Sequence, residues 1–115
     1  MATKKKLLQA AAGNAGGAAL NVEDVFSTYL YEGTGANQTI TNGIDLSGEG
    51  GLVWIKNRPI GGSNLIFDTE RGVNNVLETN ANFQQYTYGN TLTSFNSNGF
   101  TVGSGSTGNL NRSGD

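Results

Sequence analysis

The stretch Gly50–Arg58, which reads Gly-Gly-Leu-Val-Trp-Ile-Lys-Asn-Arg, decides the fold of this chain. Side chains of a strand alternate between two faces, so Val53 and Ile55 point to one face. Leu52 and Trp54, the only tryptophan, point to the other. A strand that is apolar on both faces is typical of the interior of a sheet covered by a second layer. We therefore expect this strand at the centre of a sheet, with its tryptophan buried.

Further strands are predicted after this stretch. Gly61–Asn64 has the composition of a hairpin loop, which would return residues 65–69 antiparallel to the tryptophan strand. Residues 73–79 form a weaker strand pattern, with Val76 and Leu77 as the expected buried pair.

The last apolar segments, residues 91–95 and 99–103, predict a hairpin across residues 96–98. Leu92 and Val102 are its expected core residues, with Phe95 and Phe100 near the turn. A sandwich with an apolar core normally closes with one more strand. We therefore expect a module that is incomplete or is completed by a neighbour.

Before the tryptophan strand, residues 25–31 alternate as a strand does, and residues 38–41 form a second, half-polar strand pattern. Asn42-Gly43 is typical of a hairpin turn, and residues 44–46 then predict a short third strand. The chain is thus expected to be mainly β, an antiparallel β-sandwich with short strands and tight turns.

Composition limits the possible chemistry. The chain has 115 residues, enough for one domain, with a formal net charge of −2 and neither cysteine nor histidine. A disulfide framework and a thiolate metal site are excluded, and the commonest general base is missing. The charge gives no electrostatic footprint for nucleic acid, and spanning a membrane needs about 20 apolar residues, which the chain lacks.

The N-terminal residues differ from the rest. Residues 1–22 contain three lysines and no acidic residue, whereas the remainder contains four basic and nine acidic residues. We predict a short helix over about residues 3–12 and a Gly/Ala tether after it. This divides the chain into an anchor, residues 1–22, and a β-sandwich module, residues 23–115.

The anchor is expected to dock onto another protein through a basic and apolar run. That run consists of Lys4, Lys5, Lys6, Leu7 and Leu8. The alternatives are a frayed terminus without a role, a cleaved secretory signal, and lysines that precede a nucleic acid contact.

Paired carboxylates are the one hint of catalysis. Asp68 and Glu70 would share a strand face, as the acids of glycosidases flank a scissile bond. A local ion pair of Asp68 or Glu70 with Arg71 or Arg58 is the simpler interpretation, and we expect no enzyme.

Ligand sites have two candidates. Asp45 and Glu49 could bind calcium through carboxylate oxygens or simply solvate a turn, and the spacing matches no EF-hand pattern. We expect no cofactor. Tyr86 and Tyr88, in a stretch rich in Asn and Gln, could stack against a glycan, or they are half-buried rim residues of the sandwich.

Four blocks, residues 42–46, 50–58, 65–72 and 92–103, carry a family resemblance. In this order and spacing they resemble virion structural proteins of tailed bacteriophages, notably phages of marine bacteria and cyanobacteria. Those are tail-fibre, tail-tip or appendage proteins with modules similar to concanavalin A or laminin G. The likeness extends over residues 25–115.

The resemblance implies a concanavalin-like jelly roll and a structural virion protein located in the phage tail, extracellular once assembled. The partners it implies are other tail or baseplate proteins and further copies of this chain, with a trimer favoured because fibres are commonly trimers. A carbohydrate-binding, lectin-like module that recognises a host surface glycan is the alternative function. No catalytic residue follows from the resemblance.

Overall fold

The computed structural model describes residues 21–104 and 110–114. The docking residues predicted in the anchor, Lys4, Lys5, Lys6, Leu7 and Leu8, lie outside these ranges.

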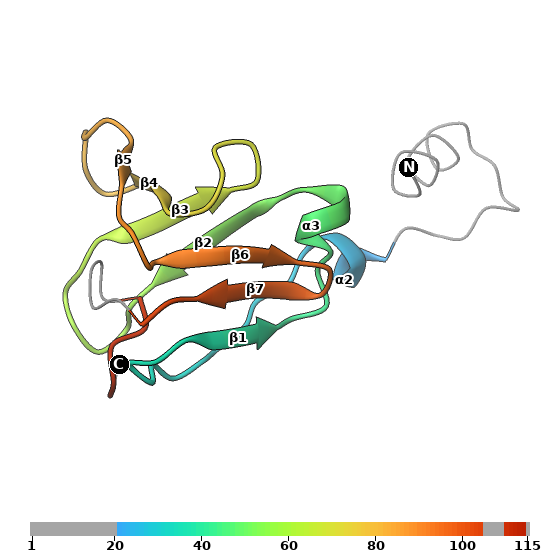
Figure 1. Ribbon diagram of the computed structural model, residues 1–115, viewed down its shortest axis with the longest axis horizontal. Helices are drawn as coiled ribbons and strands as arrows, with labels where there is room; N and C mark the ends of the chain where they lie inside the picture. The colour runs from blue at the N-terminus through green and yellow to red at the C-terminus, as the bar shows by residue number, and fades with distance from the viewer. Residues whose placement is uncertain (1–20, 105–109, 115) are drawn as a thin grey trace, which may run out of the picture.

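The described chain is mainly β, as predicted, and its strands form two antiparallel sheets (Figure 1). One sheet has the strand order β1-β7-β6 and the other β2-β3-β4-β5. The elements are α2 (Val22–Val25), β1 (Gln38–Thr41), α3 (Leu46–Glu49), β2 (Leu52–Lys56), β3 (Asn64–Asp68), β4 (Asn75–Glu78), β5 (Tyr86–Thr87), β6 (Leu92–Asn96) and β7 (Gly99–Val102).

Both predicted hairpins are confirmed. β2 pairs antiparallel with β3, with Trp54 opposite Ile66. β6 pairs antiparallel with β7, with Phe95 opposite Phe100. The turn signals of the sequence therefore place these strands correctly, because a short polar loop between two apolar segments brings neighbouring segments together.

The inner faces of the two sheets enclose one apolar core. Leu92 and Val102, the residues predicted for the last hairpin, are fully buried, and so is Val76. Leu77, expected to be buried with Val76, is only half-buried because it points to the opposite face of β4. The core contains Ile40, Leu46, Val53, Ile55, Leu65, Phe67, Val76, Leu92, Phe100, Val102 and Leu110.

The predicted central position of the tryptophan strand is wrong. β2 pairs only with β3 and forms an edge of the four-stranded sheet. Val53 and Ile55 are buried against the core, but Leu52 is 58% exposed and Trp54 64% exposed. The outer face of β2 remains uncovered because the described chain forms two layers, and no third layer lies over this face.

Two further predicted strands are wrong. Residues 25–31 belong to no strand: α2 ends at Val25, and the backbone continues at Phe26 in an extended conformation without a sheet partner. Residues 44–46 do not form a strand either. Asp45 instead caps α3, because its carboxylate accepts a hydrogen bond from the Gly48 amide at 2.8 Å.

The C-terminal residues contribute more than their composition indicates. Leu110 is buried in the core, and Asn111 is fully buried beside it. The Asn111 amide donates to the carbonyl groups of Ala36 and Gly103, and its Oδ1 accepts from the Thr34 amide. One side chain thereby joins three segments that are distant in the sequence.

Candidate functional site

A groove runs along the edge strand β2, between residues 24–31 and residues 50–59. We call it the edge groove, and we call residues 26–31 the lead segment. The groove has a volume of about 1300 Å³, and the core residues Phe100 and Leu110 reach its lining. It therefore opens from solvent down to the apolar interior.

Along this groove β2 has a hydrogen-bonding edge that no other strand of the described residues covers. The Thr69 amide donates to the Gly51 carbonyl at 3.0 Å, which makes Gly51 and Thr69 a hydrogen-bonded pair of the β2–β3 ladder. Bonded and non-bonded pairs alternate in an antiparallel ladder, so Val53 and Ile55 bond to β3. The amide and carbonyl groups of Leu52, Trp54 and Lys56 consequently point away from β3, toward the groove.

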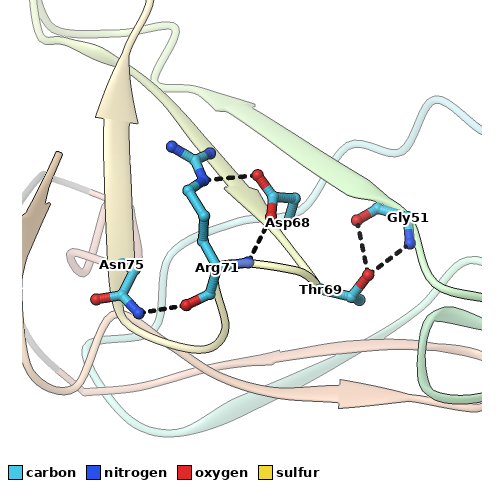
Figure 2. Close-up of polar contacts among 5 residues, drawn as sticks. All are labelled: Gly51, Asp68, Thr69, Arg71 and Asn75. Atoms are coloured by element: carbon cyan, nitrogen blue, oxygen red, sulfur yellow. Dashed lines mark hydrogen bonds and ion pairs between the residues drawn. The ribbon is translucent and has the colours of Figure 1, made fainter.

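The start of β2 is fixed in place by the end of β3 (Figure 2). The Thr69 hydroxyl accepts a hydrogen bond from the Gly51 amide at 3.0 Å, in addition to the ladder bond. Gly51 at the head of β2 is therefore hydrogen-bonded twice to Thr69 at the end of β3.

The turn after β3 is held by the ion pair that the sequence predicts. Arg71 Nε lies 2.6 Å from Asp68 Oδ2, and the Arg71 amide donates to Asp68 Oδ1 at 2.7 Å. The backbone hydrogen bond from Arg71 is the main cause that lowers the pKa of Asp68. Asn75 donates to the Arg71 carbonyl, so the turn is tied to β4 as well (Figure 2). Glu70 is exposed and has no part in this pair.

Large apolar side chains are exposed around the edge groove. Leu30 is 75% exposed and Phe26 63% exposed in the wall opposite Trp54. On the outer face of the sheet, Trp54 lies opposite Ile66, and Ile66 lies opposite Leu77, so an apolar stripe crosses three strands. Contiguous exposed apolar surface of this kind marks sites of interaction with other molecules.

The two ends of the edge groove carry opposite charges. Asp24 of α2 and Glu49 of α3 are exposed lining residues at the end where β2 begins. Lys56 and Arg58, at the end of β2 and just beyond it, are exposed lining residues at the other end. The groove therefore has an acidic end and a basic end with an apolar middle.

The lead segment is tied down where it leaves the groove. The Tyr31 hydroxyl donates to the Leu110 carbonyl, and burial raises the pKa of Tyr31 to about 12. Gly33 passes so close to the Arg112 carbonyl that a Cβ at this position would collide with it. Only glycine fits this crossing, which holds residues 31–35 against the C-terminal residues and away from β2.

The sequence-predicted tyrosine pair forms a second surface, at the opposite edge of the same sheet. The rings of Tyr86 and Tyr88 meet edge to face with centroids 4.5 Å apart. Tyr86 is half-buried and its hydroxyl donates to Glu78, which also accepts from Ser63 Oγ at 2.5 Å. Tyr88 is 40% exposed, so it presents more of its ring to a ligand than Tyr86 does.

Hydrogen bonds and burial shift two pKa values at this edge. The bond from Ser63, followed by the bond from Tyr86, lowers the pKa of Glu78. Burial, followed by the bond to the Glu78 carboxylate, raises the pKa of Tyr86. The pair is thus held as a carboxylate and a neutral phenol.

The described residues contain neither a cluster of metal ligands nor a membrane-spanning helix. Asp45 uses its carboxylate to cap α3, and residues 21–104 and 110–114 contain no group of three or more acidic side chains placed to hold a metal ion. Neither helix in these ranges has the length and hydrophobicity needed to cross a membrane.

The sequence analysis missed the edge groove. The residues that line it were assigned to a buried central strand and to a second strand, and alternation alone gives the same pattern for a central and an edge strand. The available signal was Leu52-Val53-Trp54-Ile55 itself, which is apolar on both faces and so indicates an apolar outer face as well as an inner one.

Comparison with known proteins gives one family. No curated protein and no solved structure matches the chain. The model of a family described as a domain of unknown function, DUF7483, matches residues 21–115, which include both sheets and the edge groove. The chain belongs to the DUF7483 family.

Proposed function

We propose that this protein is a structural, assembly-forming component of a tailed-phage particle, carried by the tail or one of its appendages. The observation that carries the proposal is the edge groove, where a bare strand edge lies among exposed apolar side chains. A monomer gains nothing from exposing Phe26, Leu30 and Trp54 together, whereas a subunit of a larger assembly can bury them against a neighbour.

The kind of assembly comes from the sequence resemblance to tail-fibre and appendage proteins. That resemblance also favours several copies of the chain, and it assigns residues 1–22 to docking on a tail or baseplate protein. The location in the virion and the partners are therefore part of the same proposal.

The experiment examines particles of the phage that encodes the chain. Mass spectrometry of gradient-purified particles should detect the protein in a fixed ratio to the major tail protein, and immunogold labelling should place it on the tail. A variant without residues 1–20 should still fold, by circular dichroism, but should be absent from particles. Particles without the protein would overturn the proposal, and normal incorporation of the shortened variant would overturn the docking role of its first residues.

A second function, glycan binding, is favoured by the ring pair of Tyr86 and Tyr88. Exposed aromatic rings beside amide side chains suit the apolar faces of sugars, and Phe83, 63% exposed, lies nearby in the sequence. Binding on a glycan array should then be lost in Tyr88→Ala and retained in Tyr29→Ala, a matched change of an exposed tyrosine beside the edge groove. Equal binding by both variants would exclude this surface as the site.

A further inference from the structure

We propose that the edge groove accepts one extended peptide strand from a partner protein, which adds antiparallel to β2. The strand carries an acidic residue at its N-terminal end, alternating apolar residues in the middle and a basic residue at its C-terminal end. This inference rests on the proposed assembly function and names the chemistry of its partner.

The backbone supplies the first argument. The amide and carbonyl groups of Leu52, Trp54 and Lys56 point into the groove, and the strand that carries them is hydrogen-bonded at Gly51 to Thr69. A partner strand satisfies such groups by continuing the ladder, which is the mode of recognition known as β-strand addition. All strand pairs of the described sheets are antiparallel, and antiparallel pairing is the more stable kind.

Two segments of the chain line the groove. Residues 24–31 and β2 both contribute lining residues, so a single strand added to β2 lies beside both segments. β2 of a second copy carries β3 along one edge and cannot enter in this way. Both walls also lead away from the helices in the same direction (Figure 1), so one strand can be antiparallel to both.

The residues that line the groove determine which side chains the bound strand should carry. On one face an added strand would meet the core residues Phe100 and Leu110 at the bottom of the groove, which requires apolar side chains at alternate positions. On the other face its side chains would lie beside Leu52 and Trp54, at the rim. Five residues of β2 cover about 17 Å at about 3.4 Å per residue, so a peptide of about seven residues reaches both charged ends.

The charged residues at the two ends of the groove determine the direction in which the strand binds. An antiparallel strand begins beside the end of β2, where Lys56 and Arg58 favour an acidic residue. It ends beside the start of β2, where Asp24 and Glu49 favour a basic residue. A strand with the reversed charges meets like charges at both ends, which disfavours binding.

Trp54 provides the measurement, because it is the only tryptophan and lies at the rim of the groove. The probe is the synthetic peptide acetyl-Asp-Val-Thr-Val-Thr-Val-Lys-amide, titrated into the full chain. We expect a saturable blue shift of tryptophan emission as the strand covers the indole. The charge-reversed peptide acetyl-Lys-Val-Thr-Val-Thr-Val-Asp-amide should bind at least tenfold more weakly, and a peptide with proline at the central valine should give no shift.

Variants of the protein test the direction independently. The double change Lys56→Glu and Arg58→Glu should remove the tenfold preference or reverse it. Arg112→Glu, which changes an exposed arginine that does not line the groove, should keep it. Circular dichroism of each variant confirms that it is folded before it is titrated.

The following results would overturn the proposal. No emission shift with any peptide, or equal affinity for both charge patterns, overturns the strand-accepting groove. A blue shift that depends only on protein concentration, with a dimer in sedimentation analysis, assigns the groove to a second copy and also overturns it. In both cases the assembly function stands if purified particles contain the protein, so the two failures are distinguishable.

Discussion

The two edges of the four-stranded sheet differ in how they meet solvent. β2, at one edge, is five residues long and exposes Leu52 and Trp54. β5, at the other edge, has only two residues, and its Tyr86 is engaged by Glu78. Short edge strands with satisfied polar side chains resist unwanted pairing, whereas a long apolar edge invites it.

The difference indicates that the β5 edge is closed within the molecule, whereas the β2 edge can still pair with another strand. We call them the finished edge and the available edge. At the β5 edge, the hydrogen bonds among Ser63, Glu78 and Tyr86 close the surface within the molecule. At the β2 edge, the backbone groups of three successive outward-facing residues have no partner strand in the described chain. Different substitutions should therefore affect folding and binding. Changes at the core and at the finished edge should alter the stability, and changes at the available edge should alter the binding of a partner.

The largest expected effect comes from the core beneath the available edge. Phe67 of β3 is fully buried, and Phe67→Ala should lower the free energy of unfolding by about 3–5 kcal/mol because it leaves a cavity. Trp54→Ala, on the exposed face one strand away, should cost about 0.5 kcal/mol. Urea titration followed by circular dichroism measures both. Similar losses in the two variants would mean that the outer face is covered in solution.

Proline substitutions in β2 test which backbone groups are free. Val53→Pro removes an amide bonded to β3 and should cost about 3 kcal/mol or more. Leu52→Pro removes an amide that faces the groove, at the first residue of the strand, and should cost about 1 kcal/mol. Val53→Ala separates the loss of the side chain from the loss of the ladder bond. A larger loss for Leu52→Pro than for Val53→Pro would contradict the assigned edge.

Loss of the Asn111 hydrogen bonds should have an intermediate effect on the free energy of unfolding. Asn111→Ala removes two buried donors and one acceptor, and leaves the carbonyl of Gly103 without this partner. We expect a loss of about 2 kcal/mol in the free energy of unfolding. The control is Asn37→Ala, which changes an exposed asparagine and should alter the stability little. If the two variants unfold at the same urea concentration, the Asn111 hydrogen bonds to Thr34, Ala36 and Gly103 do not stabilise the fold.

Substitutions at the finished edge should change the stability least, and their effect should depend on pH. The pKa of Glu78 is lowered in the folded state, so its stabilising contribution is present above the unfolded value of about 4.3 and is lost as pH falls through the folded pKa. The pKa of Tyr86 is raised, so its contribution is present below about 10 and is lost as pH rises further.

Two conservative variants isolate these contributions. Glu78→Gln should flatten part of the acid limb in a plot of urea midpoint against pH. Asp68→Asn should flatten this limb too, since the pKa of Asp68 is also lowered. Tyr86→Phe should cost about 1 kcal/mol at neutral pH and remove part of the alkaline loss, and the rest belongs to Tyr31, whose pKa is also raised. An unchanged pH profile in Glu78→Gln would show that this carboxylate is not held as described.

The sequence predicts the strands well where a turn joins neighbours. β2 pairs with β3, and likewise β6 with β7, as the turns between them predict, although the expected burial of Trp54 is wrong. Local signals suffice there because each strand pairs with the next one along the chain. Leu92 and Val102 are examples, since both were expected in the core and both are fully buried.

The sequence does not reveal which strands lie at an edge. Alternation shows that Leu52 and Trp54 share a face, but whether another layer covers that face depends on the whole fold. The lead segment has the composition of a strand and an extended backbone at Phe26, yet it pairs with no strand within residues 21–104 and 110–114. Asn111 lies in a run of Gly, Ser and Asn that resembles any surface loop, so its burial has no local signature.

The pairing of β1 with β7 has a consequence for how the chain folds. Thr39 and Thr101 are hydrogen-bonded neighbours although 62 residues separate them in the sequence. Contacts between residues so distant in sequence form slowly, because the intervening chain must first be ordered. During synthesis β2 and β3 leave the ribosome before β7, the partner of β1, so the tryptophan-bearing edge of β2 is open to aggregation throughout that interval.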